Sequence, residues 1–455
     1  MKPTRNRIMK TRLDSVGRSL LALMVLSAAA FASDPIPAAK QKKPIALVGG
    51  TIHTVSGETI QGGTIVFDKG RITAIGMNVI VPAEAEKITI AGKHVYPGLI
   101  NASTTLGLTE IASVRGSVDE AETGTINPNA RAEVAVNPES ELIPVSRSGG
   151  VAIVATTPQG GLLSGTAAAM MLDGWTWEEM TLKAPLGLVV NWPAMTYVQN
   201  RFNRQTKEEW QKQRDDQLKA IRDAFSAARA YMVAKESEKQ RGVPYHETDS
   251  RWEAMIPVLQ KTVPVWVYAN ELSQIQAAVT WAEEEGVKLV LVGGGDSWRV
   301  TNQLKAKNIP VLVENVLNSP RRRWEDYDGV YTLPKKLHDA GVSFAVCVGA
   351  GEPTADASST RDLVHHAAIA SAYGLQKDEA LKSITLYPAQ ILGIADRVGS
   401  LEVGKDATLI ITTGDPLDLE TNVEQVYIQG KKCDMRDKHK QLYEKYRRKY
   451  EQLGN

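Results

Sequence analysis

The middle of the chain alternates short apolar runs with amphipathic helical segments, and this rhythm limits the possible folds more than any other feature. Residues 263–267 precede a helical pattern over 273–285, and residues 288–292 precede another over 297–307. Repeated strand and helix pairs are typical of a parallel sheet or barrel. Because an eight-stranded barrel needs roughly 250 residues, we predict an α/β fold with a (β/α)8 TIM-like barrel over residues 96–399. The alternative is a doubly wound open sheet, but no Gly-rich dinucleotide fingerprint follows any of the strand-like runs.

Both ends of the chain instead carry short runs of β-forming residues separated by turn signals. Asp68-Lys69-Gly70 lies between two such runs and is typical of a hairpin turn. The same style returns near the C-terminus, where a run at residues 423–428 is followed by Gly430. We therefore predict one small composite β domain built from residues 45–95 and 400–433.

Two further helices are expected. Thr206 and Glu209 have the spacing of a capping box, and apolar residues then recur at helical spacing as far as Met232. This pattern predicts a long helix with one face packed on the barrel. A C-terminal helix is predicted over residues 434–455, with Leu442, Tyr446 and Tyr450 along one face, and we expect it to dock on the protein rather than bind a membrane.

The N-terminus has the pattern of a secretory signal. Residues 1–32 contain six basic residues and one acidic residue, an apolar run, and the small-residue pattern Ala30-Phe31-Ala32. The apolar run is shorter than the roughly 20 residues of a membrane-spanning helix, which favours cleavage after Ala32 over an uncleaved anchor. A linker at residues 33–44 would follow. Removal of residues 1–32 lowers the formal net charge from +1 to −4, which argues against a nucleic-acid partner. We expect a periplasmic or secreted protein that makes no membrane contact after cleavage.

One stretch, Tyr96 to Thr105, resembles the end of the first barrel strand in the amidohydrolase superfamily. The superfamily pattern there is P-G-[LF]-I-D-x-H-x-H, and its two histidines bind a catalytic metal. An ordered run of motifs between Glu379 and Leu417 is also similar to the C-terminal third of that superfamily's imidazolonepropionase-like members. The resemblance implies a hydrolase of C–N (non-peptide) bonds that acts through a metal-activated water.

The expected metal ligands are nevertheless replaced. Asn101, Ser103 and Thr105 stand where the first strand would carry Asp, His and His. Tyr268 stands at the fifth-strand histidine, Gly349 stands at the eighth-strand aspartate, and the sixth strand offers no histidine. Neutral hydroxyls are poor ligands for zinc. The chain therefore resembles a divergent member without the usual metal-ligand histidines, and we expect no bound metal and no other cofactor.

Candidate site residues follow from these positions and from the loops after the strands, where barrel enzymes keep their chemistry. Lys183 is included because it resembles the carboxylated bridging lysine of the superfamily, although a lysine paired at the barrel rim is the alternative. The candidate acid/base residues are Glu110, Tyr268 and Asp296, and the candidate ligand-contacting residues are Asn101, Ser103, Thr105, Arg115, Lys183 and Gly349.

Two functions remain open at this point. The first is an exported amidohydrolase-like hydrolase with a degenerate or rebuilt active site. The second is a catalytically silent binding or scaffolding protein that pairs with an active relative. Either function is compatible with a small-molecule ligand at the barrel mouth and with a homo- or hetero-oligomer that includes a related amidohydrolase.

Overall fold

A computed structural model describes residues 36–199, 205–238, 244–349 and 356–454. The chain divides into two compact units, residues 1–36 and 37–455, and the account below concerns the second. The predicted signal sequence and the first residues of the predicted linker lie outside the described residues. Within the described ranges, no helix has the length and apolar character that crossing a membrane requires.

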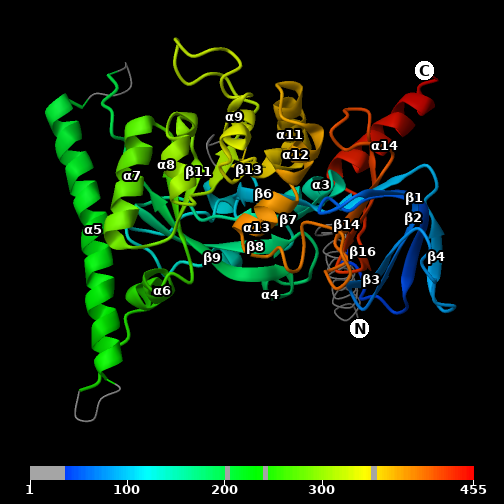
Figure 1. The fold of residues 1–455 in the computed structure, drawn as a ribbon, viewed down its shortest axis with the longest axis horizontal. Coiled ribbons are helices and arrows are strands. Elements are labelled where there is room, and N and C mark those ends of the chain that lie inside the picture. Colours follow the sequence, from blue (N-terminus) through cyan, green and yellow to red (C-terminus); the bar gives the residue numbers. More distant parts are fainter. Residues whose placement is uncertain (1–35, 200–204, 239–243, 350–355, 455) are drawn as a thin grey trace, which may run out of the picture. The chain divides into compact units, whose positions relative to one another are not determined.

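The middle of the chain forms an eight-stranded barrel-like sheet whose strands follow one another in chain order (Figure 1). Together with a separate β domain, this sheet confirms the predicted fold class. All neighbouring strands run parallel except β8, which is antiparallel to both β7 and β9. The strands are β6 (Leu99–Thr104), β7 (Val151–Thr156), β8 (Leu163–Met171), β9 (Thr181–Asn191), β10 (Val265–Ala269), β11 (Leu289–Gly293), β12 (Val311–Glu314) and β13 (Phe344–Cys347).

The seam between β13 and β6 is bridged by a side chain. The Asn101 amide donates to the Val348 carbonyl at 3.0 Å and accepts from the Val348 N–H at 2.9 Å. Beside it, the Ile100 N–H donates to the Ile384 carbonyl at 2.8 Å. The buried Asn101 thus takes the part of a strand partner and satisfies backbone groups that would otherwise be left unpaired. This predicted site residue holds the barrel together.

Helices cover the outside of the barrel. Thr206 and Glu209 form the predicted capping box at the start of α5 (Lys207–Ser237). One face of α5 is buried through Ile221, Ala224, Phe225, Ala228 and Tyr231, while the remainder is mostly solvated. The other described α-helices are α2 (Ala132–Ala135), α3 (Leu142–Ser148), α4 (Trp177–Met180), α6 (Ser250–Leu259), α7 (Leu272–Glu285), α8 (Thr301–Ala306), α9 (Leu333–Ala340), α10 (Asp356–Ser359), α11 (Leu363–Ala372), α12 (Lys377–Lys382), α13 (Leu386–Ile391) and α14 (Lys438–Gln452).

The two ends of the sequence share a second sheet. Its order is β16-β15-β14-β5-β1-β2-β3, with β4 on β1, so the antiparallel pair β5 and β14 joins the N-terminal part to the C-terminal part. The predicted turn at Lys69 and Gly70 connects β2 to β3, and both residues have positive φ. The strands are β1 (Ile45–His53), β2 (Thr59–Asp68), β3 (Arg71–Gly76), β4 (Glu86–Thr89), β5 (His94–Pro97), β14 (Leu409–Thr412), β15 (Val423–Ile428) and β16 (Lys431–Lys432).

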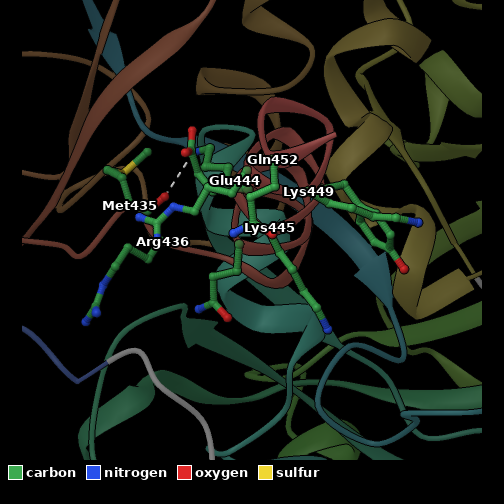
Figure 2. A pocket seen from close by; sticks show the side chains of 10 residues that line it. Met435, Arg436, Glu444, Lys445, Lys449 and Gln452 are labelled. Carbon is green, nitrogen blue, oxygen red and sulfur yellow. Dashed lines mark hydrogen bonds between the residues drawn. The ribbon is translucent and has the colours of Figure 1, made fainter. Parts of the chain in front are cut away.

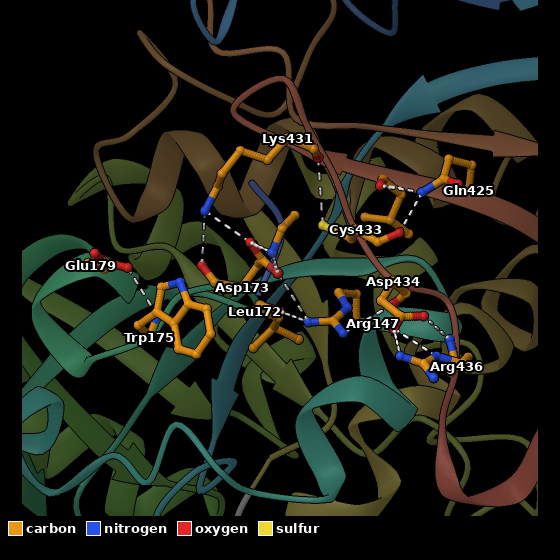
Figure 3. A network of polar contacts seen from close by, with 12 residues as sticks. Arg147, Leu172, Asp173, Trp175, Glu179, Gln425, Lys431, Cys433, Asp434 and Arg436 are labelled. Carbon is orange, nitrogen blue, oxygen red and sulfur yellow. Dashed lines mark hydrogen bonds and ion pairs between the residues drawn. The ribbon is translucent and has the colours of Figure 1, made fainter. Parts of the chain in front are cut away.

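A buried charge cluster connects the barrel to the C-terminal part of the chain (Figure 3). The carboxylate of Asp173, which follows β8, accepts from the backbone N–H of Ala38, and it lies 2.9 Å from Lys431 Nζ and 3.5 Å from Arg147 Nη1. Arg147 also donates to the carbonyl of Asp434 at 3.1 Å. Because the Asp173 side chain is fully buried, removing one of its partners would leave an uncompensated charge. We therefore assign this cluster to stability.

The C-terminal helix differs from expectation. Asp437 caps α14 by accepting from the Lys440 N–H at 2.9 Å, but no residue of the helix is buried. The side chains of Leu442, Tyr446 and Tyr450 are 40%, 50% and 53% exposed. The helix contacts the rest of the chain at its first turn, where His439 Nε2 lies 2.9 Å from Arg361 Nη1. The expected packing of the face with Leu442, Tyr446 and Tyr450 is not seen, because these three side chains are exposed.

Candidate functional site

Three side chains from the C-terminal ends of different strands meet in the barrel mouth. Ser103 on β6 donates to Oε1 of Glu314 on β12 at 2.8 Å, and its Oγ lies 3.0 Å from the hydroxyl of Tyr268 on β10. Tyr268 also donates to Thr157 Oγ1 at 3.4 Å. Ser103 is fully buried, and Glu314 is 9% exposed. The structure thus brings together two predicted residues, Ser103 and Tyr268, and adds Glu314, which was not a sequence candidate.

The carboxylate of Glu314 fills the space beside Gly349, just past β13. A Cβ atom on Gly349 would lie 1.8 Å from Glu314 Oε1, so no side chain fits at position 349 while Glu314 keeps its place. Position 349 is where the sequence resemblance leads one to expect an aspartate. The neighbouring strand therefore supplies a carboxylate to the place from which that aspartate is missing.

Tyr268 is held as a neutral hydrogen-bond donor. Burial raises the pKa of its phenol well above the usual value, and the negative charge of Glu314 adds to the increase. Hydrogen bonds to Ser103 and Thr157 oppose the shift without reversing it. The chain of groups from Tyr268 through Ser103 to Glu314 therefore carries one carboxylate and two neutral hydroxyls.

Asp296, a predicted acid/base residue, is engaged in an ion pair. Both its oxygens accept from Arg322, at 2.9 and 2.8 Å, and Oδ2 also accepts from the Leu272 N–H at 2.9 Å. Burial would raise the pKa of Asp296, but the hydrogen bonds from Arg322 and Leu272 outweigh it and lower the pKa. These contacts connect Asp296 to the loop after β12, so its observed part is to position that loop.

The other predicted residues do not join Ser103, Tyr268 and Glu314. Thr105 is buried just past β6, Arg115 is exposed at the start of a 3-10 turn, and Glu110 is half-buried in the same loop. Lys183 lies near the start of β9, and its Nζ donates to the carbonyls of Leu392 at 3.1 Å and Gly393 at 2.9 Å, just after α13. Because the barrel mouth is at the other end of β9, Lys183 does not reach it.

A cavity of about 560 Å³ opens above Glu314. Its wall comes from the ends of β10 and β11, from the loop between β12 and α9, and from α9 itself. The lining includes Asn270, Trp298, Glu314, Arg321, Trp324 and Lys336. A volume of several hundred Å³ with a few converging polar groups is typical of a small-molecule site.

A larger hollow, of about 750 Å³, lies along α14 (Figure 2). It is lined by long side chains of that helix and the residues just before it, such as Arg436, Lys445 and Lys449. These side chains are exposed, and the buried polar cluster of the barrel mouth does not extend to them. The cavity above Glu314 is therefore the better candidate for a functional site.

Comparisons with known proteins agree on the fold. Residues 266–433 match the model of the amidohydrolase family. An amidohydrolase from Thermotoga maritima MSB8 is 28% identical, with a TM-score of 0.76 over 85% of this chain and 99% of that one. A molinate hydrolase superposes with a TM-score of 0.52 at 16% identity, over 87% of this chain and 96% of that one. Amidohydrolase tasK of Hapsidospora irregularis is 22% identical over 391 residues. The aligned region covers 81% of this chain but only 39% of that longer protein.

The residues at the mouth do not fit the metal that the sequence resemblance implies. Within the described ranges, no group of three or more His, Cys, Asp or Glu side chains is arranged to hold an ion. Ser103 and Tyr268 are neutral and hydrogen-bonded, and a single carboxylate makes an incomplete zinc site. His366 lies outside this set, because it is buried in α11, where its Nδ1 accepts from the Leu317 N–H at 3.3 Å.

Proposed function

The chain is a member of the amidohydrolase superfamily, and on that premise we propose that it hydrolyses a C–N bond other than a peptide bond at a rebuilt, metal-free site centred on Glu314. The observation that carries the proposal is the position of the Glu314 carboxylate, 1.8 Å from where a Cβ on Gly349 would lie. A carboxylate at this place restores a base that the sequence lacks at position 349.

The geometry supports a general base rather than a serine nucleophile. Glu314 lines the cavity, whereas Ser103 and Tyr268 do not. Ser103 donates to Glu314 Oε1, and the Tyr268 hydroxyl is hydrogen-bonded to Ser103. In the proposed reaction, Glu314 takes a proton from a water as the water attacks the amide carbon, and then gives that proton to the leaving nitrogen. Asn270, in the same cavity wall, offers an amide N–H to the carbonyl oxygen. Ser103 and Tyr268 are positioning residues in this scheme.

The test is a hydrolysis screen of small amides, lactams and ureides with protein dialysed against a chelator. A positioned general base contributes about 10²- to 10⁴-fold, so Glu314→Gln should lower kcat by that factor and change KM little. Asp326→Asn, an exposed carboxylate in the same cavity wall, is the matched control and should leave kcat within about twofold. Turnover that survives Glu314→Gln would contradict the proposal.

A second candidate is a binding protein without catalysis, paired with an active relative. It is favoured by the absence of Ser103 and Tyr268 from the cavity lining, which leaves no hydroxyl of this cluster there as a nucleophile. Ligand binding at the mouth with no turnover across the screen would support this candidate. Co-purification from the native host with a related amidohydrolase would support the proposed pairing with an active relative.

We also propose that the protein is exported and begins at Ser33 after cleavage. The support is the basic, apolar and small-residue pattern of residues 1–32. Intact-mass measurement of the protein from its native host tests this, and a mass that retains residues 1–32 would contradict it.

A further inference from the structure

We propose that the loop after β12 builds a subsite for a carboxylate, so that the ligand of the barrel mouth is a small organic acid with a flat or apolar body. The inference deepens the proposed function by naming the ligand class. It rests on the proposed function only in the claim that the bound molecule is hydrolysed. Binding of the same ligand is equally compatible with a protein that has no catalytic activity.

Two adjacent arginines in this loop have different surroundings. Arg322 is committed, because its guanidinium makes two bonds to Asp296 and a third, at 2.7 Å, to Glu325. Arg321 lines the cavity, and its side chain forms no hydrogen bond or ion pair with any residue in the described part of the chain. Its guanidinium carbon would lie only 3.1 Å from a Cβ on Gly295, so the group packs against bare backbone. The charges of Glu314, Asp296 and Glu325 act on Arg321 through space. Because no hydrogen bond joins its guanidinium to these three carboxylates, Arg321 presents N–H donors to the cavity.

A guanidinium in this setting fits a carboxylate. Its planar fork can make two parallel hydrogen bonds to the two oxygens of one carboxylate. Lys336 in α9 adds a second positive charge to the same wall, with Nζ 5.0 Å from the centre of the Trp298 ring. As with Arg321, the side chain of Lys336 forms no hydrogen bond or ion pair with the residues that the structure describes. The same wall also carries Glu325, which is paired with Arg322, and the exposed Asp326. The attraction for an anion is therefore local to Arg321 and Lys336.

Two indole rings supply the apolar part of the cavity. Trp298 is 44% exposed and Trp324 is 68% exposed, and both line the cavity. Arg322 lies over the Trp324 ring at 5.4 Å, which holds that ring at the cavity. Large aromatic side chains left open beside a cavity are typical of binding surfaces, and they pack well against flat or apolar groups. The body of the ligand would lie between the cationic wall and the floor.

Glu314 sets the orientation of the ligand. Its negative charge lies at the floor and would repel the carboxylate, which therefore binds at Arg321 and Lys336. An amide N–H at the other end of the ligand would meet the Glu314 carboxylate as an acceptor. The cavity volume of about 560 Å³ accommodates a molecule of this kind. An N-acyl amino acid has a carboxylate, an amide N–H and, with an aromatic side chain, a flat apolar body. This class of compound therefore serves as the probe.

The experiment measures binding of N-acetyl-L-phenylalanine and of its uncharged carboxamide by isothermal titration, using the full-length chain as expressed. We expect the acid to bind the unmodified protein at least about tenfold more tightly than the carboxamide, as a charge-assisted bidentate pair allows. Arg321→Gln should reduce this preference to within about twofold, and Arg321→Lys should restore part of it. Arg323→Gln is the matched control, because Arg323 is exposed and does not line the cavity.

Each outcome decides between the claims. Equal binding of acid and carboxamide, binding of neither, or a preference that survives Arg321→Gln would overturn the subsite. A preference that depends on Arg321 without any hydrolysis of the acid would keep the subsite and contradict the proposed hydrolase. Hydrolysis of neutral amides that is indifferent to Arg321 would keep the hydrolase and overturn the subsite.

Discussion

Replacing Gly349 with alanine should disrupt the mouth chiefly through Glu314, to which the three nearest atoms belong. The added Cβ would lie 1.8 Å from Glu314 Oε1 and 2.3 Å from Cδ, so the carboxylate must move by about 1.2 Å to reach a separation of 3.0 Å. That movement breaks the 2.8 Å hydrogen bond from Ser103. Loss of a hydrogen bond to a charged group costs about 1.5 to 3 kcal/mol, and overpacking adds about 1 to 3 kcal/mol. We expect Gly349→Ala to lower the free energy of unfolding by about 2.5 to 6 kcal/mol.

A double-mutant cycle measured by urea unfolding tests the cause. In a Glu314→Ala background the collision disappears, so Gly349→Ala should then cost less than about 0.5 kcal/mol. Gly116→Ala is the matched control, because nothing lies within 4 Å of a Cβ at Gly116. An equal cost of Gly349→Ala in both backgrounds would refute the placement of the Glu314 carboxylate.

Two further predictions concern pH and the C-terminal helix. Burial, with a contribution from His365, lowers the pKa of His366 from its usual 6.5 to about 4. The stabilising contribution of the neutral ring is therefore complete above pH 6.5 and is lost as the pH falls toward 4. Urea midpoints at pH 7 and pH 4.5 should differ by less in His366→Gln than in the unmodified protein, and an unchanged difference would contradict this. Tyr446→Ser should change the free energy of unfolding by less than about 0.5 kcal/mol, whereas the buried Ile221→Ala should cost about 2 to 5 kcal/mol. A large loss for Tyr446→Ser would show that α14 packs on a surface in solution.

The barrel was predictable because its signals are local and repeated. The apolar run at residues 288–292 became β11 with a shift of one residue, and the capping box at Thr206 and Glu209 forms as the spacing indicates. The antiparallel direction of β8 had no such signal. Its residues are all buried, so the strand reads as a continuous apolar run and periodicity says nothing of its direction.

The site was only partly predictable, because it depends on pairs that are distant in sequence. Ser103 and Tyr268 are sequence candidates because they stand at positions where metal ligands are expected. In the structure their hydroxyl oxygens lie 3.0 Å apart. Glu314 was missed, although it is the one acidic residue at the end of the apolar run in β12, which is a usable signal at the mouth of a barrel. The motif position of Asn101 predicts a place in the site, but its side-chain amide is hydrogen-bonded to the backbone of Val348 at the seam of the barrel. Motif position alone cannot separate these two uses of a buried polar side chain.

The central claim is that the barrel mouth works without the metal that the sequence resemblance implies. It is tested most directly by elemental analysis of the purified protein after dialysis, together with hydrolysis and thermal unfolding before and after chelation. We predict well under one metal ion per chain, with no effect of the chelator on unfolding or on any activity. Stoichiometric zinc that is lost on chelation together with a hydrolytic activity would contradict the account.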